Sequence, residues 1–551
     1  MPETSLPEYD LAIIGAGPVG LTLASFVGQA GLRVLVVEQL PALIDYPRGV
    51  GMDDECLRTF QAIGLADAVS RHTTPHQWME FRTARGKTLA LIKPQTTVFG
   101  WPRRNAFIQP LVDKVLFEGL ARYPNVEIAF STELKSLVQD GGGVTLHVAG
   151  GGGAERAIHC RYLVGCDGGR SLVRKSVDIP FEGQTEATRW IVVDLEDDPV
   201  GVPNTILYCD PARPFVSIAL PHAVRRLEFM VMAGETEETL TSETGLRGLL
   251  GRIMPHPEKA RVIRSRVYTH HSRIADTFRS GKVLIAGDAA HLMPVWQGQG
   301  YNSGIRDANN LAWKLIEVLQ GRSDERLLDS YTAERRAHAG AMIRLSTTAG
   351  RIFSPTNRVM AVLRDVLFSA MKYVPPVRDY IVQMRFKPMP TYEQGVVVHG
   401  ADGDHVVGRM FPQPAVRRAD GSTALLDDVI GNRFAILSWA VDPGIYMGEA
   451  ASEAWRRLGG RTIIVRPPTE SAAVADADGH ETVCDHTLAL KDWFANGRVS
   501  TVVIRPDRFI AAAGGPQQID GMIGGLGDVL FATPDAASAG RPKRAARGGG
   551  R

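Results

Sequence analysis

The sequence is poor in cysteine, and its cysteines form no recognisable pairs. Five cysteines are spread over 551 residues, with no CxxC arrangement and no cysteine–histidine cluster at the spacing of a zinc site. A disulfide framework, a dithiol redox centre and a zinc site are therefore not expected. We expect reduced, mostly buried thiols in a cytoplasmic protein, and no metal site is predicted.

Long apolar runs and an excess of charge of one sign are also missing. No stretch approaches the ~18 uninterrupted apolar residues that suggest a membrane-spanning helix. The first residues, MPETSLPEYD, are polar and acidic, whereas a signal peptide opens with basic residues. The formal net charge is +2, which gives no reason to expect nucleic acid as a partner. We therefore expect a cytoplasmic protein without a membrane segment.

Apolar strands that end in a glycine or an acidic residue recur along the chain. Residues 9–14 (YDLAII) precede a glycine loop, residues 33–38 (RVLVVE) end in a glutamate, and the strings CRYLVGCDGGRS and GKVLIAGDAAH follow much later. Continuous apolar strands of this kind are typical of a buried parallel sheet. Their spacing predicts an α/β protein in which one sheet is assembled from distant segments.

The loop after the first strand has a GxGxxG pattern, GAGPVG, with glycines at Gly15, Gly17 and Gly20. In such a loop the first glycine permits a tight turn, the second lets the backbone approach a pyrophosphate, and the third lets the next helix pack on the strand. Glu38 closes the following strand, where a carboxylate can bind the hydroxyls of a ribose. The pattern predicts a dinucleotide site without deciding between FAD and NAD.

A second glycine-rich string favours FAD. Gly287 and Asp288 (GDAAH) follow the strand KVLIA, and Gly298 and Gly300 lie a few residues further on. Asp288 can hold a ribityl hydroxyl, and the glycines let backbone N–H groups and a helix N-terminus approach a flat, partly anionic ring. An enzyme that binds only a nicotinamide dinucleotide does not need this second loop, whereas an enzyme that binds FAD needs it to hold the ribityl chain and the flavin ring. For His291, beside the loop, a structural hydrogen bond is favoured over a proton-transfer role.

A third string, CDGGRSLVRK, places Asp167, Gly168 and Arg170 after the strand YLVG. An Asp-Gly pair alone indicates a turn, but this string stands beside two others. Together the three resemble the fingerprints of class A flavoprotein monooxygenases, the para-hydroxybenzoate hydroxylase-like superfamily, over roughly residues 8–535. The resemblance implies that the first string binds the ADP part of FAD. It also implies that the Asp-Gly string is linked to FAD and the nicotinamide cofactor, and that the Gly-Asp string holds the ribityl chain.

The resemblance adds further residues to the expected site. Arg48, in YPRGVGMDDE, resembles an arginine that contacts FAD, with a solvated loop arginine as the alternative. Gln109, in RRNAFIQPLVDKVL, resembles a polar residue that opens a helix near the flavin phosphates. Pro294 and Trp296 lie in HLMPVWQGQGYNSGIRDANNLAWKL, which resembles the branch that hydroxylates 3-hydroxyphenyl alkanoic acids. With His291, they are the expected catalytic residues.

The same resemblance implies a reaction. NADH or NADPH reduces FAD as a transient visitor, since the chain has one complete GxGxxG loop and no second nucleotide domain is expected. Reduced FAD and O2 form a C4a-hydroperoxide, whose distal oxygen attacks a ring carbon ortho or para to a phenol hydroxyl. The protein must hold the ring over the flavin and keep water away. The expected reaction converts 3-(3-hydroxyphenyl)propionate to its 2,3-dihydroxy (catechol) product.

The residues that contact the substrate are only weakly indicated. Candidates for contact with the ring are aromatic or imidazole side chains of the β-rich stretch and the flavin loop: Tyr208, Tyr268, His270 and Trp296. Ordinary core packing explains each of them equally well. A propionate requires an arginine or backbone N–H groups. Arg213 and Arg189 are assigned to it from their position alone.

Patterning divides the chain into parts. Residues 177–269 alternate apolar and polar side chains, residues 311–384 are helix-patterned, and strands and helices alternate again beyond Pro388. This last part resembles the thioredoxin-like domain appended to phenol hydroxylase relatives. Without a CxxC pair, its expected role is packing or stabilisation of a homodimer.

The predicted fold is α/β: a Rossmann-like FAD-binding domain with an inserted β-sheet substrate domain, plus a C-terminal thioredoxin-like α/β domain. The predicted parts are the FAD-binding domain at 1–176, with part of the substrate lobe near 73–108; the β-sheet substrate domain at 177–270; the FAD-binding domain continued, with a helical segment, at 271–387; the thioredoxin-like domain at 388–535; and a disordered basic tail at 536–551.

Three alternatives stay open. The substrate could be another phenol, such as a resorcinol-type or polyketide compound. The enzyme could be a flavin reductase or oxidase that inserts no oxygen. The chain could also be a non-catalytic binding protein with a flavin fold, although the intact glycines and Asp288 argue against this. The choice between NADH and NADPH, and the oligomeric state, are undecided.

Overall fold

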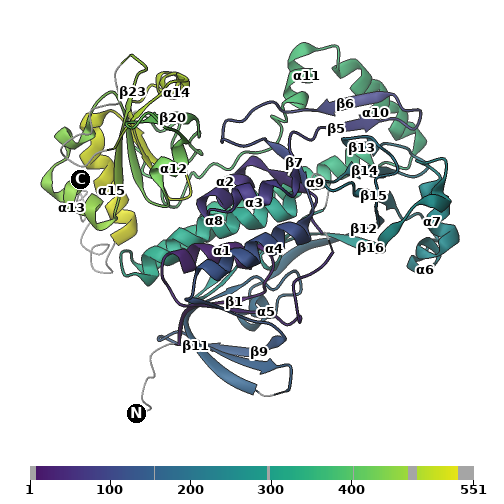
Figure 1. Cartoon of the computed structure of the whole chain (residues 1–551), viewed down its shortest axis with the longest axis horizontal. Helices are drawn as coiled ribbons and strands as arrows, with labels where there is room; N and C mark the ends of the chain where they lie inside the picture. The colour runs from purple at the N-terminus through teal and green to yellow at the C-terminus, as the bar shows by residue number, and fades with distance from the viewer. Residues whose placement is uncertain are drawn as a thin grey trace, which may run out of the picture. The chain divides into compact units, whose positions relative to one another are not determined.

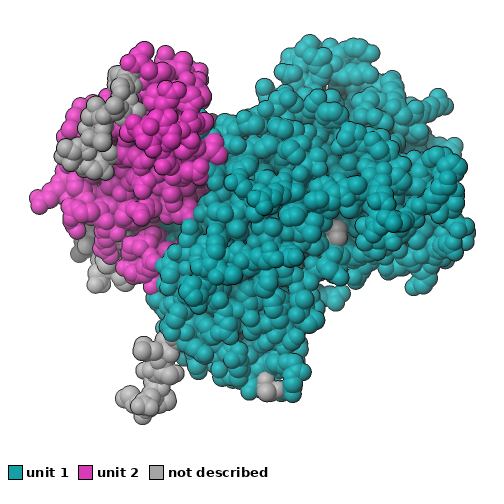
Figure 2. All heavy atoms as spheres, in the orientation of Figure 1, with its two compact units in different colours: residues 1–313, 331–391, 412–414 teal, residues 314–330, 392–411, 415–551 magenta. Residues whose placement is uncertain are grey.

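The computed structural model describes residues 8–46, 48–153, 155–294, 298–400, 403–469 and 481–531. The chain forms two compact units, which Figure 2 shows in different colours. Unit 1 comprises residues 1–313, 331–391 and 412–414, and unit 2 comprises residues 314–330, 392–411 and 415–551. Trp296 and the predicted tail at 536–551 lie outside the described residues.

The first sheet of unit 1 is built from segments far apart in the sequence. Its strands, in order across the sheet, are β17 (Arg279–Ser280), β18 (Val283–Ile285), β11 (Glu155–Gly165), β1 (Tyr9–Ile14), β2 (Val34–Val37) and β8 (Val126–Ala129), with β10 (Val144–Gly150) pairing with β11, and β9 (Thr132–Gln139) with β10. The pairs β1–β2, β1–β11 and β11–β18 are all parallel. A sheet assembled from distant apolar strands was predicted from the sequence and is confirmed here.

Helices cover this sheet and connect its strands. They are α1 (Pro18–Gln29), α2 (Asp54–Ala62), α3 (Ala66–Ser70), α4 (Gln109–Gly119), α5 (Leu172–Ser176) and α8 (Gln299–Leu319). In Figure 1, α1 and α4 lie side by side, and they are in contact. Helix α1 begins with a proline, which suits the first turn because the N–H that proline lacks would have no helical partner there.

The second sheet of unit 1 is mostly antiparallel. Its strands, in order, are β19 (His291–Leu292), β16 (Val262–Ala275), β12 (Phe181–Leu195), β15 (Arg225–Met230), β14 (Phe215–Ala219), β13 (Thr205–Tyr208), β5 (Met79–Arg82) and β6 (Thr88–Ile92). Alternation of side chains puts Trp190 and Leu207 in an apolar cluster on one face, and Ile191 and Phe229 in a cluster on the other. Both faces are therefore buried, and one of them is available to form a site.

The remaining elements of unit 1 surround these two sheets. A three-stranded sheet contains β3 (Gly51–Asp53), β7 (Arg104–Phe107) and β4 (Thr73–Thr74) in that order. The remaining helices are α6 (Glu237–Thr241), α7 (Glu243–Leu250), α9 (Asp329–Phe353), α10 (Arg358–Met371) and α11 (Pro375–Val382). The helical pattern predicted for residues 311–384 is thus present, although α8 begins earlier, at Gln299.

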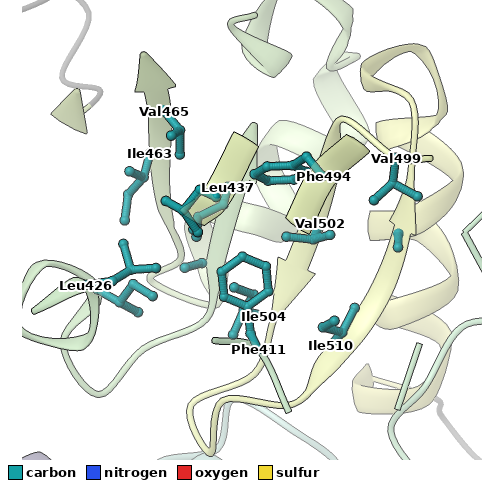
Figure 3. Packing of buried hydrophobic residues seen from close by; sticks show 14 of the residues in the cluster. Phe411, Leu426, Leu437, Ile463, Val465, Phe494, Val499, Val502, Ile504 and Ile510 are labelled. Atoms are coloured by element: carbon teal, nitrogen blue, oxygen red, sulfur yellow. The ribbon is translucent and has the colours of Figure 1, made fainter. Parts of the chain in front are cut away.

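Unit 2 has a seven-stranded mixed sheet. In order, its strands are β21 (Thr423–Leu425), β20 (Ala415–Arg418), β24 (Glu481–Cys484), β23 (Arg461–Arg466), β22 (Ala435–Trp439), β25 (Thr501–Ile504) and β26 (Ile510–Gly514). Its helices include α12 (Leu426–Ile430), α13 (Glu449–Arg457), α14 (Ala489–Asn496) and α15 (Ile519–Phe531). Figure 3 shows Leu437, Ile463, Phe494 and Val502 packed in its core. This alternation of strands and helices agrees with the α/β pattern predicted beyond residue 388.

Three further features concern thiols, membranes and metals. The five cysteines are free thiols, of which four are buried and Cys166 is half-buried. No helix among the described residues is long and apolar enough to cross a membrane. Within that same part of the chain, no group of three or more His, Cys, Asp or Glu side chains is placed to hold a metal ion.

Candidate active site

A pocket with a cavity volume of about 320 Å³ lies within unit 1. One part of its wall consists of loops at the ends of first-sheet strands, with residues Ala16, Gly17, Glu38, Cys166, Gly168, Gly287 and Asp288. Another part consists mainly of apolar side chains of the second sheet: Met79, Phe81, Trp190, Leu207, Val216 and Ile218. The pocket therefore joins the predicted dinucleotide site to the inner face of the second sheet.

The GAGPVG loop has the geometry that a pyrophosphate requires. Gly15 has φ +109°, and a Cβ atom there would lie 2.5 Å from the carbonyl oxygen of Cys166. A Cβ atom at Gly20 would overlap the carbonyl oxygen of Gly15. At Gly17, by contrast, a Cβ atom would meet nothing within 4 Å, and this residue lines the pocket just before α1. The loop thus leaves open space where the N-terminus of α1 can receive an anion.

Glu38 is held at the end of β2 by two backbone groups. Its Oε2 accepts a hydrogen bond of 2.9 Å from the N–H of Ala16, and its Oε1 accepts one of 2.9 Å from Leu40. Each carboxylate oxygen keeps a further lone pair, and the residue lines the pocket. This arrangement fits the predicted contact with the ribose of an adenosine group.

Gln109 shapes the loop that carries Arg48. Gln109 opens α4, as predicted, and its Oε1 accepts hydrogen bonds from the N–H groups of Arg48 (3.2 Å) and Gly49 (2.7 Å). Its Nε2 donates to Asp113 at 3.0 Å, and burial raises the pKa of that carboxyl to about 7. The Arg48 side chain lines the pocket beside Tyr46, whose hydroxyl it contacts at 3.3 Å. Gln109 is therefore placed to position Arg48.

Asp288 reaches the pocket from the loop after β18. Its side chain lines the pocket, and the exposed surface of the residue faces that cavity. Burial by the surrounding protein raises the pKa of its carboxyl. The preceding Gly287 donates its N–H to Asp307 at 3.0 Å, which fixes the loop. A carboxylate in this position suits a ribityl hydroxyl.

Asp167 uses its carboxylate to cap α5. It accepts hydrogen bonds from the hydroxyl of Ser171 at 2.5 Å and from the N–H groups of Leu172 at 2.7 Å and Val173 at 3.1 Å. Gly168, which lines the pocket, adopts φ +76° in the same turn. The Asp-Gly pair therefore forms a capped turn whose glycine faces the cavity.

The string contains two arginines, Arg170 and Arg174, of which Arg170 is the predicted one. Arg170 is exposed and is not part of the pocket wall. Arg174, which the sequence analysis left out of the site, is buried and donates to the carbonyl oxygens of Ala289 at 2.8 Å and Gly169 at 3.1 Å. Arg174 thus ties the Asp-Gly turn to the Gly-Asp loop. Its signal in the sequence was its place in the string CDGGRSLVRK, where it is a basic residue in the last turn of a short helix.

Of the residues expected to be catalytic, the structure describes His291 and Pro294, and both lie outside the pocket wall. The Nε2 atom of buried His291 lies 2.7 Å from Asp307, and Asp307 also accepts from Arg335 at 2.8 Å. Although burial opposes the effect, the neighbouring His291 and Arg335 lower the pKa of Asp307. Pro294 is buried, and neither it nor His291 is part of the wall. The structure thus favours the structural role for His291 that the sequence analysis preferred.

Strand alternation sorts the predicted ring contacts. His270, on β16, lines the pocket and stacks near Trp190, with ring centroids 6.3 Å apart. Tyr208 points to the other face of β13, where it stacks on Phe215 at 4.2 Å, and Leu207 takes the place on the pocket side. Tyr268 is also outside the wall. The sequence could not show on which face of its strand Tyr208 lies.

The two arginines assigned to the propionate have other partners and do not line the pocket. Arg213 forms an ion pair with Glu235 and donates to the carbonyl oxygen of Met230 at 2.9 Å. Arg189 is exposed and donates to the carbonyl oxygen of Glu235 at 3.2 Å. Because neither residue is part of the wall, the structure gives no support to this assignment.

Six polar residues that sequence reasoning missed do line the pocket: Gln77, Arg104, Asp113, Thr205, Glu228 and Tyr301. Glu228 lies on β15, and burial raises the pKa of its carboxyl. Nearby on the same sheet, burial lowers the pKa of the His270 imidazole to about 4. The signal for Glu228 was a carboxylate inside the strand-patterned string RRLEFMVM, where its side chain shares the face of Met230.

A buried ionic network holds α8, whose first turn borders the pocket. Arg306 binds Glu55 through its Nε at 2.6 Å and also forms an ion pair with Asp53. Lys387 donates to Asp53 at 2.7 Å. Asn302 donates to the carbonyl oxygens of Gly51 at 3.0 Å and Gly298 at 2.7 Å. The start of α8 is therefore fixed from both sides.

The glycine cradle opens into an apolar chamber, an arrangement that suits a dinucleotide cofactor held beside an apolar substrate. Residues 8–346 match the family described as "FAD binding domain", and the chain belongs to that family. It is an FAD-dependent aromatic monooxygenase. Residues 408–528 match a second family, described as "HcaD C-terminal domain".

Particular relatives extend this finding to nearly the whole chain. A 3-(3-hydroxy-phenyl)propionate/3-hydroxycinnamic acid hydroxylase of Escherichia coli (strain SMS-3-5 / SECEC) is 51% identical, over 96% of each chain. The protein of the same description from Paraburkholderia xenovorans (strain LB400) is 47% identical, over 95% of this chain and 92% of the relative.

Solved structures agree with the fold. The flavin-dependent monooxygenase PieE, in complex with FAD and substrate, superposes with a TM-score of 0.80 at 21% identity, over 95% of this chain and 99% of that one. The OxyS anhydrotetracycline hydroxylase from Streptomyces rimosus gives a TM-score of 0.75 at 25% identity, over 96% and 99%. The mixed α/β architecture is therefore that of flavin monooxygenases.

Proposed function

We propose that this chain hydroxylates 3-(3-hydroxyphenyl)propionate to its 2,3-dihydroxy product, with NAD(P)H as reductant and O2 as oxidant. The observation that carries the proposal is the single pocket that joins the glycine cradle to the apolar face of the second sheet. The choice of substrate is supported by relatives of 47% and 51% identity, whose names give that acid. When bound, FAD supplies the hydride acceptor and the centre that activates O2.

The residues present fit FAD along its length. Gly17 and the N-terminus of α1 would hold the pyrophosphate, and Glu38 the adenosine ribose. Asp288 would hold the ribityl chain. The first turn of α8, near Gly298 and Gly300, would face the ring system, where its N–H groups stabilise negative charge. The nicotinamide would bind only transiently.

The polar residues of the second sheet would act on the phenol. His270 is neutral at pH 7 because of its lowered pKa, and a neutral imidazole offers one hydrogen-bond donor and one acceptor. Glu228 faces the same pocket. Either side chain can accept a hydrogen bond from the phenol hydroxyl and so increase the electron density of the ring. The apolar wall around them excludes water from the reaction.

The test measures NADH oxidation and O2 uptake by the purified protein, with and without 3-(3-hydroxyphenyl)propionate. We expect a large increase with substrate, a product heavier by one oxygen atom and little H2O2. An increase with H2O2 as the main product would contradict hydroxylation of this acid. Bound FAD without any response would direct the test to other phenols, such as resorcinol-type or polyketide compounds.

The predicted domain organisation forms part of this proposal. We propose an FAD-binding domain at 1–176 and 271–387 and a β-sheet substrate domain at 177–270. We further propose a C-terminal thioredoxin-like domain at 388–535 with a packing or dimer-stabilising role. Support for the last domain comes from the parallel strands β22, β23 and β24 beside the antiparallel hairpin β25–β26. A cytoplasmic location is proposed from the sequence.

A further inference from the structure

Arg104 faces the inside of the pocket from the edge of β7. Successive side chains of a strand point to opposite faces, so Arg104 and Ala106 share one face. Ala106 belongs to the apolar cluster that contains Trp190 and Leu207. Asn105 points the other way and donates to the carbonyl oxygen of Met52. The guanidinium of Arg104 therefore lies on the side of the strand that faces the substrate chamber, and it lines the cavity.

This guanidinium has no counter-ion, unlike other arginines of the same region. Arg225 is paired with Asp198, and Arg226 with Asp194. The side chain of Arg104 makes no hydrogen bond or ion pair with any described residue, and its Nε atom is buried without a partner. Burial alone lowers its pKa to about 10, and no carboxylate opposes the shift. An uncompensated cation in an apolar pocket is unfavourable, which is understandable if a ligand supplies the negative charge.

Glu228, an acid of the pocket wall, is not the counter-ion of Arg104. Arg226 acts on the Glu228 carboxyl, and Arg104 is not among the charged groups that shift it. The pocket thus has two separate polar regions, with Arg104 on β7 and with Glu228 and His270 on the second sheet. A phenol with an acidic side chain presents two matching polar groups, one at each end of an apolar ring.

We propose that Arg104 binds the carboxylate of the substrate through its guanidinium, while the phenol hydroxyl is directed to Glu228 and His270. This inference rests on the proposed function and assigns the acidic end of the substrate. The planar guanidinium can donate two parallel hydrogen bonds to a carboxylate, which a lysine cannot reproduce. Arg104 accordingly sets the preference for acids over neutral phenols.

The test compares 3-(3-hydroxyphenyl)propionate with its neutral amide in steady-state hydroxylation. In the wild type, we expect the KM of the amide to exceed that of the acid by at least about tenfold, as suits a hydrogen bond to a charged group. Arg104→Met should abolish this ratio, and Arg104→Lys should restore part of it. FAD content, read from the flavin absorbance, reports whether each variant is folded.

Arg213→Met is the matched control, because Arg213 is an arginine of the same region that has its own carboxylate partner. This variant should keep the wild-type ratio of KM values. A wild type that takes acid and amide equally overturns the assignment, even if Arg104→Met fails to fold. Retention of the full ratio in Arg104→Met, or its loss in Arg213→Met, overturns it as well. If the wild type hydroxylates neither compound, the proposed function itself fails.

Discussion

At the scale of single residues, substitution of two glycines of the GAGPVG loop should have opposite effects on stability and on FAD binding. A methyl group at Gly17 would enter open space on the pocket side, whereas one at Gly20 would overlap the carbonyl oxygen of Gly15. We expect Gly17→Ala to leave the unfolding temperature of the FAD-free protein unchanged while weakening FAD binding by about tenfold. Gly20→Ala should destabilise the FAD-free protein itself. Thermal unfolding and FAD titration of both variants distinguish the two effects.

Equal losses of stability in the two variants would contradict this account of the loop. So would normal FAD affinity in Gly17→Ala, since the open space would then not receive the pyrophosphate.

A second residue prediction concerns pH and His270. Burial lowers the pKa of this imidazole from 6.5 to about 4, so the unfolded chain binds the proton more readily between these values. Stability is therefore complete above pH 6.5 and is lost as the pH falls toward 4. The loss from this group between pH 7 and pH 5 is about 2 kcal/mol. His270→Gln should remove that part of the pH dependence.

Urea unfolding of both proteins at pH 7, 6 and 5 measures the effect. His338, whose pKa burial lowers to about 3, remains in the variant and contributes with the same sign. Identical slopes of stability against pH in wild type and variant would show that His270 is not buried as a neutral group.

At the scale of secondary-structure elements, the start of α2 carries two carboxylates with opposite roles. Although burial opposes it, Arg306 and Lys387 lower the pKa of Glu55 to about 2. Burial raises the pKa of Asp54 to about 7, although Lys387 and Arg103, the latter 3.6 Å away, oppose the shift. No hydrogen bond reaches the buried Oδ2 of Asp54. Glu55 thus joins helix α2 to Arg306 of α8, whereas the adjacent Asp54 does not.

We expect Glu55→Gln to destabilise the protein by about 3–5 kcal/mol, because it leaves Arg306 with an incomplete set of partners. Asp54→Asn should cost less than about 1 kcal/mol at pH 6, because the folded wild type already favours the neutral acid there. As the pH rises from 3.8 to about 7, Asp54 ionises in the unfolded chain but stays protonated in the folded protein, so wild-type stability falls over this range. The asparagine variant should therefore have gained on the wild type by pH 8. Denaturant unfolding at both pH values tests the pair. A larger loss for Asp54→Asn than for Glu55→Gln would contradict the assignment.

The elements also show what the sequence could and could not reveal. Glycine spacing predicted the cradle, because the conformations at Gly15 and Gly20 depend on local backbone geometry. Tyr208 and Leu207 are neighbours on one strand, and only the packing of that strand decides which of them faces the chamber. Arg104 lies next to Arg103 in the sequence, and the difference between them is tertiary: Arg103 stands beside a carboxylate, while the guanidinium of Arg104 has none.

At the scale of the whole molecule, the pocket is lined entirely by residues of unit 1. Phe494 is buried in the core of unit 2, 2% exposed. We expect Phe494→Ala to destabilise unit 2 by about 3–5 kcal/mol and to leave FAD affinity unchanged. Calorimetry and FAD titration of the variant provide the measurement. A parallel loss of FAD affinity would show that the site depends on unit 2.

The sequence patterns predicted two separate sheets, but they did not predict every strand that belongs to each sheet. Strands β5 and β6 lie in a segment predicted to join the substrate lobe, and they do pair into the second sheet. No pattern in the sequence indicates that β19, two residues long, joins β16 and attaches the Gly-Asp loop to that sheet. A strand this short has no periodicity from which to predict it.

The parallel pairing of β11 with β18 has a consequence for how the protein is made. Asp288 comes 273 residues, and the first residue of α8 comes 284 residues, after Gly15, the first glycine of the cradle. A nascent chain on the ribosome therefore lacks half of the cofactor site until more than half of the protein has been synthesised. Pairings over such separations are slow to form, and the chain must hold its apolar strands unpaired in the meantime. Uptake of FAD is therefore a late event in biogenesis, and chaperone demand should be greatest before it.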